Sequence, residues 1–243
     1  HDSTEGLDEA FLEADRHPDL WLIPGIEISA DHPFDDKGDL HMLGYFIDYK
    51  NAPFQSTLLQ FREDRASRGR LTVERLQQLN MPVEWERVVE IADGASIGRP
   101  HIAQAMVEKG YITNVQEAFN GYLDDAGVAY ISRPRISARE SVEMIQRVGG
   151  VAVLAHPLYA KDYKKVLPLL AEFGVAGFEV HYGDFSVPER EGLSRLAEEL
   201  GMLPCGGSDY HAFGKDGESL PGSVGPPMEV ALELKNRAKS ISQ

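Results

Sequence analysis

The segment PCGGSDYHAF, at residues 204–213, places a carboxylate and an imidazole two positions apart. Asp209 and His211 follow an apolar run that ends in Gly206 and Gly207. Glycine adopts backbone conformations that other residues avoid, so we expect a Gly-Gly turn that points both side chains the same way. The four residues Ser208–His211 could instead form an ordinary helix-capping loop. A carboxylate and an imidazole held together could instead bind a metal ion such as Mn, Fe or Zn.

Further imidazoles and carboxylates occur at comparable places along the chain. Glu27 and His156 stand at or just beyond the carboxyl ends of predicted strands, His41 lies within one, and His1 precedes the first helix. Each alone is more often a packing or surface residue than a ligand. Together they are predicted to converge at one end of a barrel, where α/β barrels build their active sites. A cluster of imidazoles without metal would be costly, because its members would titrate and repel one another. The joint pattern therefore favours a metal site.

The elements that must position these residues alternate between strand and helix. Apolar and β-branched runs predict strands at 20–29, 39–48, 151–157, 175–182 and 202–211, with amphipathic helices between the later ones. This order predicts parallel βαβ units that form a barrel or a doubly wound sheet. Residues 55–135 show helical spacing only, so we expect a helical insertion domain there and an α/β domain built from 1–54 and 136–243.

Composition narrows the possible functions. The 243 residues carry a formal net charge of −15, which argues against a broad basic groove for long nucleic acid. A small polyanionic substrate is compatible with this charge if bound cations gather locally. Cys205 is the only cysteine, and no apolar run approaches the ~18 residues of a membrane span. We therefore expect a cytoplasmic protein without disulfides or membrane contact, and its oligomeric state stays open.

Six motifs occur in a characteristic order: His1-Asp2, IPGIEIS, HMLGY, GRPHIA, AHP and GSDYH. This ordered set, which spans essentially the whole chain, resembles the PHP (polymerase and histidinol phosphatase) family. Within it the set is most similar to the branch of nucleoside 3′,5′-bisphosphate phosphatases and 5′→3′ exoribonucleases of the RNase AM type. The resemblance implies a distorted (β/α)7 barrel with a helical insertion. It also implies up to three divalent metal ions, commonly Mn with Fe or Zn also seen.

The resemblance further implies roles for individual residues. It makes metal ligands of His1, Glu27, His41, His156, Asp209 and His211. It places Arg99 against a substrate phosphate, where a planar guanidinium can bind two oxygens, and His101 near the phosphate or the leaving group. Without the resemblance, Arg99 is an ordinary surface charge beside Pro100, the first residue of a predicted helix.

Other polar residues have less definite predictions. Arg62, Arg65 and Arg68 are expected to share one helix face, either as a solvated stripe or as a phosphate-steering one. His181 matches no ligand of the family and is expected to be structural, whereas His17 and His32 are placed in loops. Tyr130 and Tyr159 are expected to pack, with base stacking as the alternative. Cys205 is expected to be buried and unreactive.

One motif of the family does not occur in residues 1–243. It is a strand ending in His-x-His or Asp-x-His with an Asp soon after, and two strands go with it. Five strands are thus predicted where the family has seven. We expect an N-terminally truncated PHP barrel, and a protein with an incomplete site is the alternative.

The predicted function is metal-dependent phosphoester hydrolysis. The substrates would be nucleoside 3′,5′-bisphosphates, which lose the 3′-phosphate, or short 5′-phosphorylated RNA. Divalent ions lower the pKa of water and make it a nucleophile, so no Ser or Cys nucleophile is needed. Two alternatives remain: a different PHP phosphatase, acting on histidinol phosphate or a sugar phosphate, and a catalytically impaired module that binds a nucleotide or a partner protein.

Overall fold

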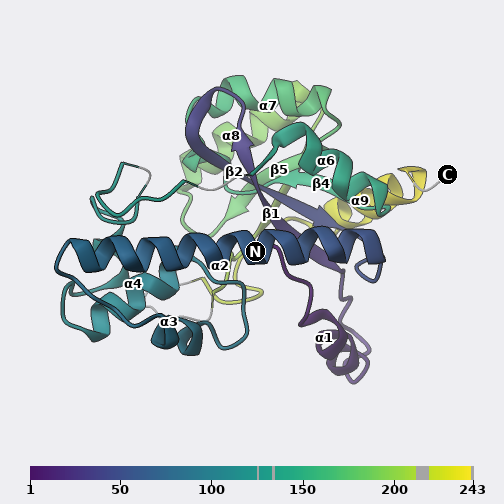
Figure 1. The fold of residues 1–243 in the computed structure, drawn as a ribbon. Helices are drawn as coiled ribbons and strands as arrows, with labels where there is room; N and C mark the ends of the chain where they lie inside the picture. Colours follow the sequence, from purple (N-terminus) through teal and green to yellow (C-terminus); the bar gives the residue numbers. More distant parts are fainter. Residues whose placement is uncertain (125, 133–134, 212–218, 242–243) are drawn as a thin grey trace. The chain divides into compact units, whose positions relative to one another are not determined.

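The computed structural model describes residues 1–124, 126–132, 135–211 and 219–241 (Figure 1). Its contacts divide the chain into two compact units. The helical unit comprises His1–Ser3 and Ala52–Arg135, and the sheet unit comprises Thr4–Asn51 and Ile136–Gln243. The helical unit thus begins three residues before the predicted insertion and includes the first three residues of the chain. The two domain ranges themselves stay a prediction.

The sheet unit is built on a mixed sheet. In the described part of the chain it has six strands in the order β3-β1-β2-β4-β5-β6. The strands are β1 Gly25–His32, β2 Asp35–Tyr45, β3 Ile136–Ser137, β4 Val151–Leu154, β5 Gly177–Tyr182 and β6 Leu203–Gly207. β2 runs antiparallel to both of its neighbours, and the other pairs are parallel. The parallel pairing predicted for the later strands is confirmed for β4, β5 and β6. β2 is antiparallel to β1 because a tight turn, not a helix, joins the two strands.

Two strand predictions need further correction. β1 begins at Gly25 and not at residue 20, after Pro24, which has no N–H to donate to a sheet. Glu27 is thus the third residue of β1 and does not end it. β3 was not predicted at all, because its two residues are too short for any periodic pattern. It pairs with Ala30 and Asp31 of β1, so the predicted count of five strands is wrong.

The two faces of the sheet carry different layers. On one face, buried Ile28, Met42 and Leu154 lie in register across β1, β2 and β4, and helices α6 (Ala138–Arg147) and α8 (Val187–Leu200) pack on the strands. Helix α9 (Met228–Ile241) packs on the opposite face, against a cluster that includes Val153 and Leu43. Leu43 pairs with Glu27, and paired residues project to the same face. Glu27 therefore lies on the α9 face.

Closure of the sheet into a (β/α)7 barrel stays a prediction. β3 and β6 are the two outer strands, and no pairing between them occurs among the described residues. The remaining helices of the sheet unit are α1 (Leu7–Ala14), the 3-10 helix η1 (Pro157–Tyr159) and α7 (Tyr163–Glu172). Ser137 and Glu140 cap α6 reciprocally, as Ser186 and Glu189 cap α8.

The helical unit has its own apolar core. It contains α2 (Ala52–Gln78), α3 (Trp85–Ala92), α4 (Arg99–Glu108) and the short α5 (Val115–Ala118). Buried Leu76, Ile102, Met106 and Leu123 are among the residues of this core. Of the helices in the described ranges, none combines the length and the apolar character that crossing a bilayer requires.

The arginines of α2 do not form a solvated stripe, which was one of the two predicted alternatives; the other, phosphate steering, stays a prediction. Arg65 is an ion-pair partner of buried Asp2, with Nε 2.5 Å from a carboxylate oxygen, and Arg62 donates to the main-chain oxygen of Asp2. Arg68 donates to the carbonyl of Ile131 at 2.6 Å. These contacts hold the start of the chain and the segment near residue 131 against α2. They also explain why His1–Ser3 belong to the helical unit.

Candidate metal centre

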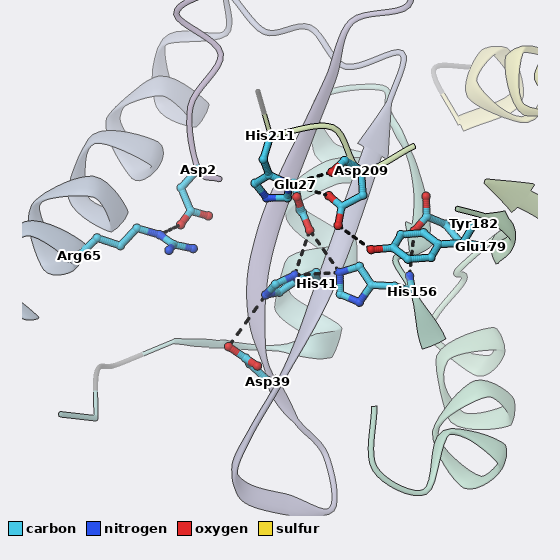
Figure 2. A network of polar contacts seen from close by, with 10 residues as sticks. All are labelled: Asp2, Glu27, Asp39, His41, Arg65, His156, Glu179, Tyr182, Asp209 and His211. Carbon is cyan, nitrogen blue, oxygen red and sulfur yellow. Dashed lines mark hydrogen bonds and ion pairs between the residues drawn. The ribbon is translucent and has the colours of Figure 1, made fainter. Parts of the chain in front are cut away.

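Three of the predicted ligands meet on the α9 face of the sheet (Figure 2). The Nδ1 atom of His41 lies 2.9 Å from Oε1 of Glu27 and 3.1 Å from Nε2 of His156. The third side of the triangle, from His156 Nε2 to Glu27 Oε1, measures 3.7 Å. Each side chain is largely but not completely buried. Two imidazoles and a carboxylate therefore converge on one point.

The antiparallel course of β2 explains why His41 takes part. The last four residues of β2 pair with β4, and Met42 lies opposite Leu154 at the carboxyl end of β4. Just beyond this pair, the N–H of Ala155 donates to the carbonyl of His41. His156 follows directly, at the point where the chain leaves the sheet. Glu27 pairs with Leu43, so it is a diagonal neighbour of His41 on the same face. Residues far apart in sequence thus share one end of the sheet.

The donor set fits a divalent transition-metal ion. Atoms bound to one cation at about 2.0–2.2 Å lie roughly 3–3.5 Å from one another, which is close to the spacing of the three atoms. Imidazole together with carboxylate suits Mn, Fe or Zn. Two imidazole nitrogens that face each other also require a shared proton or a cation between them. The residues present thus fit the metal that was predicted.

Electrostatics support the same conclusion. Burial alone would raise the pKa of Glu27, but hydrogen bonds and charge from His156 and His41 outweigh it and hold that pKa well below its usual range. For His156 the signs are opposite. Burial alone would lower its pKa, but the hydrogen bond and the charge of the Glu27 carboxylate outweigh burial and raise that pKa. Glu27 is therefore an anion at neutral pH, and the two other members of the triangle are imidazoles.

Asp209 joins this group through a tyrosine. The hydroxyl of Tyr182 donates to Oδ2 of Asp209 at 2.7 Å, and the Asp209 charge also acts on His156. Nδ1 of His211 lies 2.7 Å from the main-chain oxygen of Asp209. The structure thus places Asp209 beside the triangle and His211 beside Asp209.

The prediction that Gly206 and Gly207 form a turn before Asp209 is wrong. Gly206 and Gly207 are residues of β6 and form no turn, and the positive φ of 49° belongs to Asp209 itself. Gly206 is required for close approach: a Cβ there would lie 2.1 Å from the carbonyl oxygen of His181.

Sequence reasoning missed three polar residues of this centre. Glu179 is buried in β5 and accepts the main-chain N–H of His156 at 2.8 Å, and burial raises its pKa to about 7. The second residue is Tyr182, whose hydroxyl donates to Asp209. The third is Asp39, whose Oδ2 atom lies 3.9 Å from Nε2 of His41. The signal for Glu179 was a single carboxylate inside the apolar run VAGFEV, where a charge is costly without a partner.

The other residues named in the sequence prediction have varied surroundings. His1 belongs to the helical unit, and its role as a ligand stays a prediction. His181 lies in β5, where burial lowers its pKa. His32 is not in a loop: it ends β1, is buried, and its Nε2 lies 2.7 Å from the carbonyl of Lys161. Cys205 is buried in β6, and burial raises the pKa of its thiol to about 12, as expected for an unreactive cysteine.

Arg99 and His101 begin α4 in the helical unit. Arg99 donates to the carbonyl of Leu123 at 3.1 Å and lies over the ring of Phe119. It lines a small cavity of this unit together with Arg65 and Arg68. Nδ1 of His101 accepts the N–H of Gly98 at 3.0 Å, which leaves the ring proton on Nε2.

Comparisons with known proteins agree with this chemistry, although no protein-family profile matches the chain. The 5′-3′ exoribonuclease Rnm of Salmonella typhimurium is 32% identical over 216 residues, which cover 87% of this chain and 73% of that protein. The 3′,5′-nucleoside bisphosphate phosphatase of Chromobacterium violaceum is 28% identical over 90% of this chain and 78% of its own length.

The fold has a solved counterpart as well. A structure from Bifidobacterium adolescentis, described as a metal-dependent phosphoesterase, is 32% identical and superposes with a TM-score of 0.81 over 98% of this chain and 83% of that one. Similarity in sequence and in fold thus extends over nearly the whole chain. The chain therefore belongs to the family of phosphoester-hydrolysing enzymes that contains the 5′-3′ exoribonucleases Rnm.

Proposed function

We propose that this protein removes the 3′-phosphate of nucleoside 3′,5′-bisphosphates, or degrades short 5′-phosphorylated RNA from its 5′ end, with divalent metal ions. The observation that carries the proposal is the triangle of Glu27, His41 and His156, in which three metal-binding atoms lie 2.9–3.7 Å apart. The activities named for the relatives support the choice of substrates.

The proposed metal-binding residues are those of the sequence prediction: His1, Glu27, His41, His156, Asp209 and His211. Mn is the proposed metal, with Fe or Zn as alternatives, and up to three ions would be bound. When bound, such ions lower the pKa of water and neutralise charge on the phosphoryl oxygens. The permanent charge of Glu27 favours cation binding, and the Tyr182 hydroxyl orients the Asp209 carboxylate. Neither a Ser nor a Cys nucleophile is required.

Arg99 and His101 are proposed to act on the substrate. The guanidinium of Arg99 would bind phosphoryl oxygens and stabilise the charge that builds up on them during in-line attack. His101 would donate its Nε2 proton to a phosphoryl or leaving-group oxygen. Arg65 and Arg68 line the same small cavity as Arg99, and both guanidinium groups are already bound, to the Asp2 carboxylate and to the Ile131 carbonyl. The net charge of −15 favours a short phosphorylated substrate over long nucleic acid.

The cytoplasm is the proposed compartment. Cys205 is the only cysteine and is buried, so the chain is compatible with a reducing environment.

The experiment is phosphate release from adenosine 3′,5′-bisphosphate by protein stripped of metal and then supplied with Mn²⁺. We expect release only when Mn²⁺ is present, and loss of release in His156→Asn. His17→Asn is the matched control, because His17 is an exposed histidine that contacts only Glu13 among the pairs observed for its ring. Equal turnover with and without metal would contradict the proposal, as would full activity of His156→Asn.

A further inference from the structure

Strand β5 places two buried polar side chains against candidate ligands of its neighbours (Figure 2). Glu179 and Tyr182 are only 4% and 6% exposed. Glu179 contacts His156, which follows β4, and Tyr182 contacts Asp209, which follows β6. β5 itself supplies none of the proposed metal ligands.

The contact of Glu179 holds a strained segment of main chain. His156 has φ 28° and ψ 61°, and residues other than glycine persist in such conformations only where their surroundings hold them. Glu179 Oε2 accepts the N–H of this residue at 2.8 Å. The hydrogen bond therefore acts at the residue whose Nε2 atom belongs to the ligand triangle, and it sets the direction in which that side chain leaves the sheet.

The contact of Tyr182 orients a carboxylate. Its hydroxyl donates to Oδ2 of Asp209 at 2.7 Å, and Asp209 also has positive φ, at 49°. One carboxylate oxygen is thus tied to a phenol, and this bond limits rotation of the whole group. A ligand whose rotation is limited before the metal arrives loses less entropy when it binds.

A β-bulge makes both contacts possible from one strand. In a regular strand, residues three positions apart project to opposite faces. Here Glu179 pairs with Cys205 and His181 pairs with the next residue of β6, Gly206, so β5 advances two residues while β6 advances one. Bulges of this kind redirect side chains and are frequent beside active sites. The bulge turns Tyr182 to the face that Glu179 already occupies.

We propose that β5 orients the metal ligands on both of its sides, with Glu179 as the positioning residue for His156 and Tyr182 as the positioning residue for Asp209. This inference rests on the proposed metal-dependent function. Groups that orient metal ligands typically change metal affinity by about 10–100-fold when they are removed.

The test compares Mn²⁺ dissociation constants, measured from the electron paramagnetic resonance signal of free Mn²⁺. Tyr182→Phe and Glu179→Met remove one hydrogen bond each and should weaken Mn²⁺ binding about 10–100-fold. Glu179→Gln keeps an oxygen acceptor and should restore most of the affinity. Tyr159→Phe is the matched control, because it removes the hydroxyl of another tyrosine in the same aromatic cluster. That hydroxyl lies 3.4 Å from Asp184, which is not a proposed ligand. The Mn²⁺ affinity of Tyr159→Phe should equal that of the wild type.

Wild-type affinity in both Tyr182→Phe and Glu179→Met would overturn the inference. If Glu179→Met does not fold, as judged by circular dichroism of the metal-free protein, Tyr182→Phe decides alone. A wild-type protein that binds Mn²⁺ but releases no phosphate would overturn the proposed function only, because the affinities still decide the role of β5. A wild-type protein that binds no Mn²⁺ would overturn both.

Discussion

Glu27 shows how the surroundings of one residue determine what it can bind. A buried carboxylate normally becomes neutral, because burial penalises its charge. Here His41 and His156 contribute more than burial does and keep the pKa of Glu27 low. A carboxylate anion held beside two imidazole rings offers a cation both negative charge and nitrogen ligands. The same carboxylate on an open surface would offer the charge alone.

Arg99 allows a test at the same scale. If its guanidinium binds the substrate phosphate, Arg99→Ala should reduce transition-state stabilisation by about 2–4 kcal/mol, which is roughly a 30- to 1000-fold fall in kcat/KM. Arg99→Lys should restore only part of the activity, because an ammonium lacks the planar arrangement of donors. The measurement is steady-state hydrolysis of adenosine 3′,5′-bisphosphate with saturating Mn²⁺.

A second arginine of the helical unit provides the control. Arg87 forms exposed ion pairs with Glu90 and Glu108 on α3 and α4, so Arg87→Ala removes an equal charge without touching the proposed site. Its kcat/KM should stay within about twofold of the wild type. If Arg99→Ala and Arg87→Ala behave alike, Arg99 has no role beyond the charge it carries.

At the scale of elements, the position of the centre follows from how strands pair. The reversal of β2 brings His41 beside the end of β4, and the bulge of β5 turns Tyr182 toward Asp209. Neither depends on the chemistry of the ligands. Both depend on backbone geometry, so a change in that geometry should alter the candidate metal centre even when every proposed ligand is intact.

Gly206 is the position where this can be measured. A Cβ at residue 206 would lie 2.1 Å from the His181 carbonyl oxygen, which is main chain and cannot rotate away. Gly206→Ala should therefore lower the free energy of unfolding by about 1–3 kcal/mol and weaken Mn²⁺ binding, because β5 and β6 must move apart. Urea denaturation and Mn²⁺ titration measure the two effects.

Another glycine of the sheet unit serves as the comparison. Gly192 lies inside α8, and nothing stands within 4 Å of a Cβ added there. Gly192→Ala should raise the free energy of unfolding by about 0.5–1 kcal/mol and leave Mn²⁺ affinity unchanged. Equal stability of the two alanine variants would show that the approach at Gly206 is not rigid.

On the scale of the whole molecule, the chain has two compact units, each with an apolar cluster of its own. Leu76 belongs to the cluster of the helical unit, whereas Val153 and Leu234 belong to a cluster of the sheet unit. Since a core residue stabilises mainly the structure it packs in, the two units should respond separately to core mutations.

Leu76→Ala tests this separation. Leu76 is completely buried, and its truncation should cost about 2–5 kcal/mol. We expect faster amide hydrogen exchange in α2, α3 and α4 and unchanged exchange in β1, β2 and β4. Leu154→Ala, an equally buried change in the sheet unit, should give the reverse pattern. Equal acceleration in both units by either variant would show that they unfold as one.

Much of this protein could be predicted from its sequence, because many signals are local. Apolar spacing correctly indicated amphipathic helices between the later strands, where the structure has α7 and α8. The imidazoles and carboxylates predicted a metal site, and their roles as ligands stay a prediction. The ordered motifs predicted a phosphoesterase family, and the relatives confirm that membership.

Only the tertiary structure decided how these residues meet. The direction of β2, the existence of β3 and the bulge in β5 are set by pairing between distant segments, which leaves no periodic trace in any one of them. For the same reason Glu179 and Tyr182 look like ordinary strand residues until their partners, His156 and Asp209, lie beside them. Local sequence determined which side chains were available. Strand register, a property of the whole sheet, determined which of them could touch.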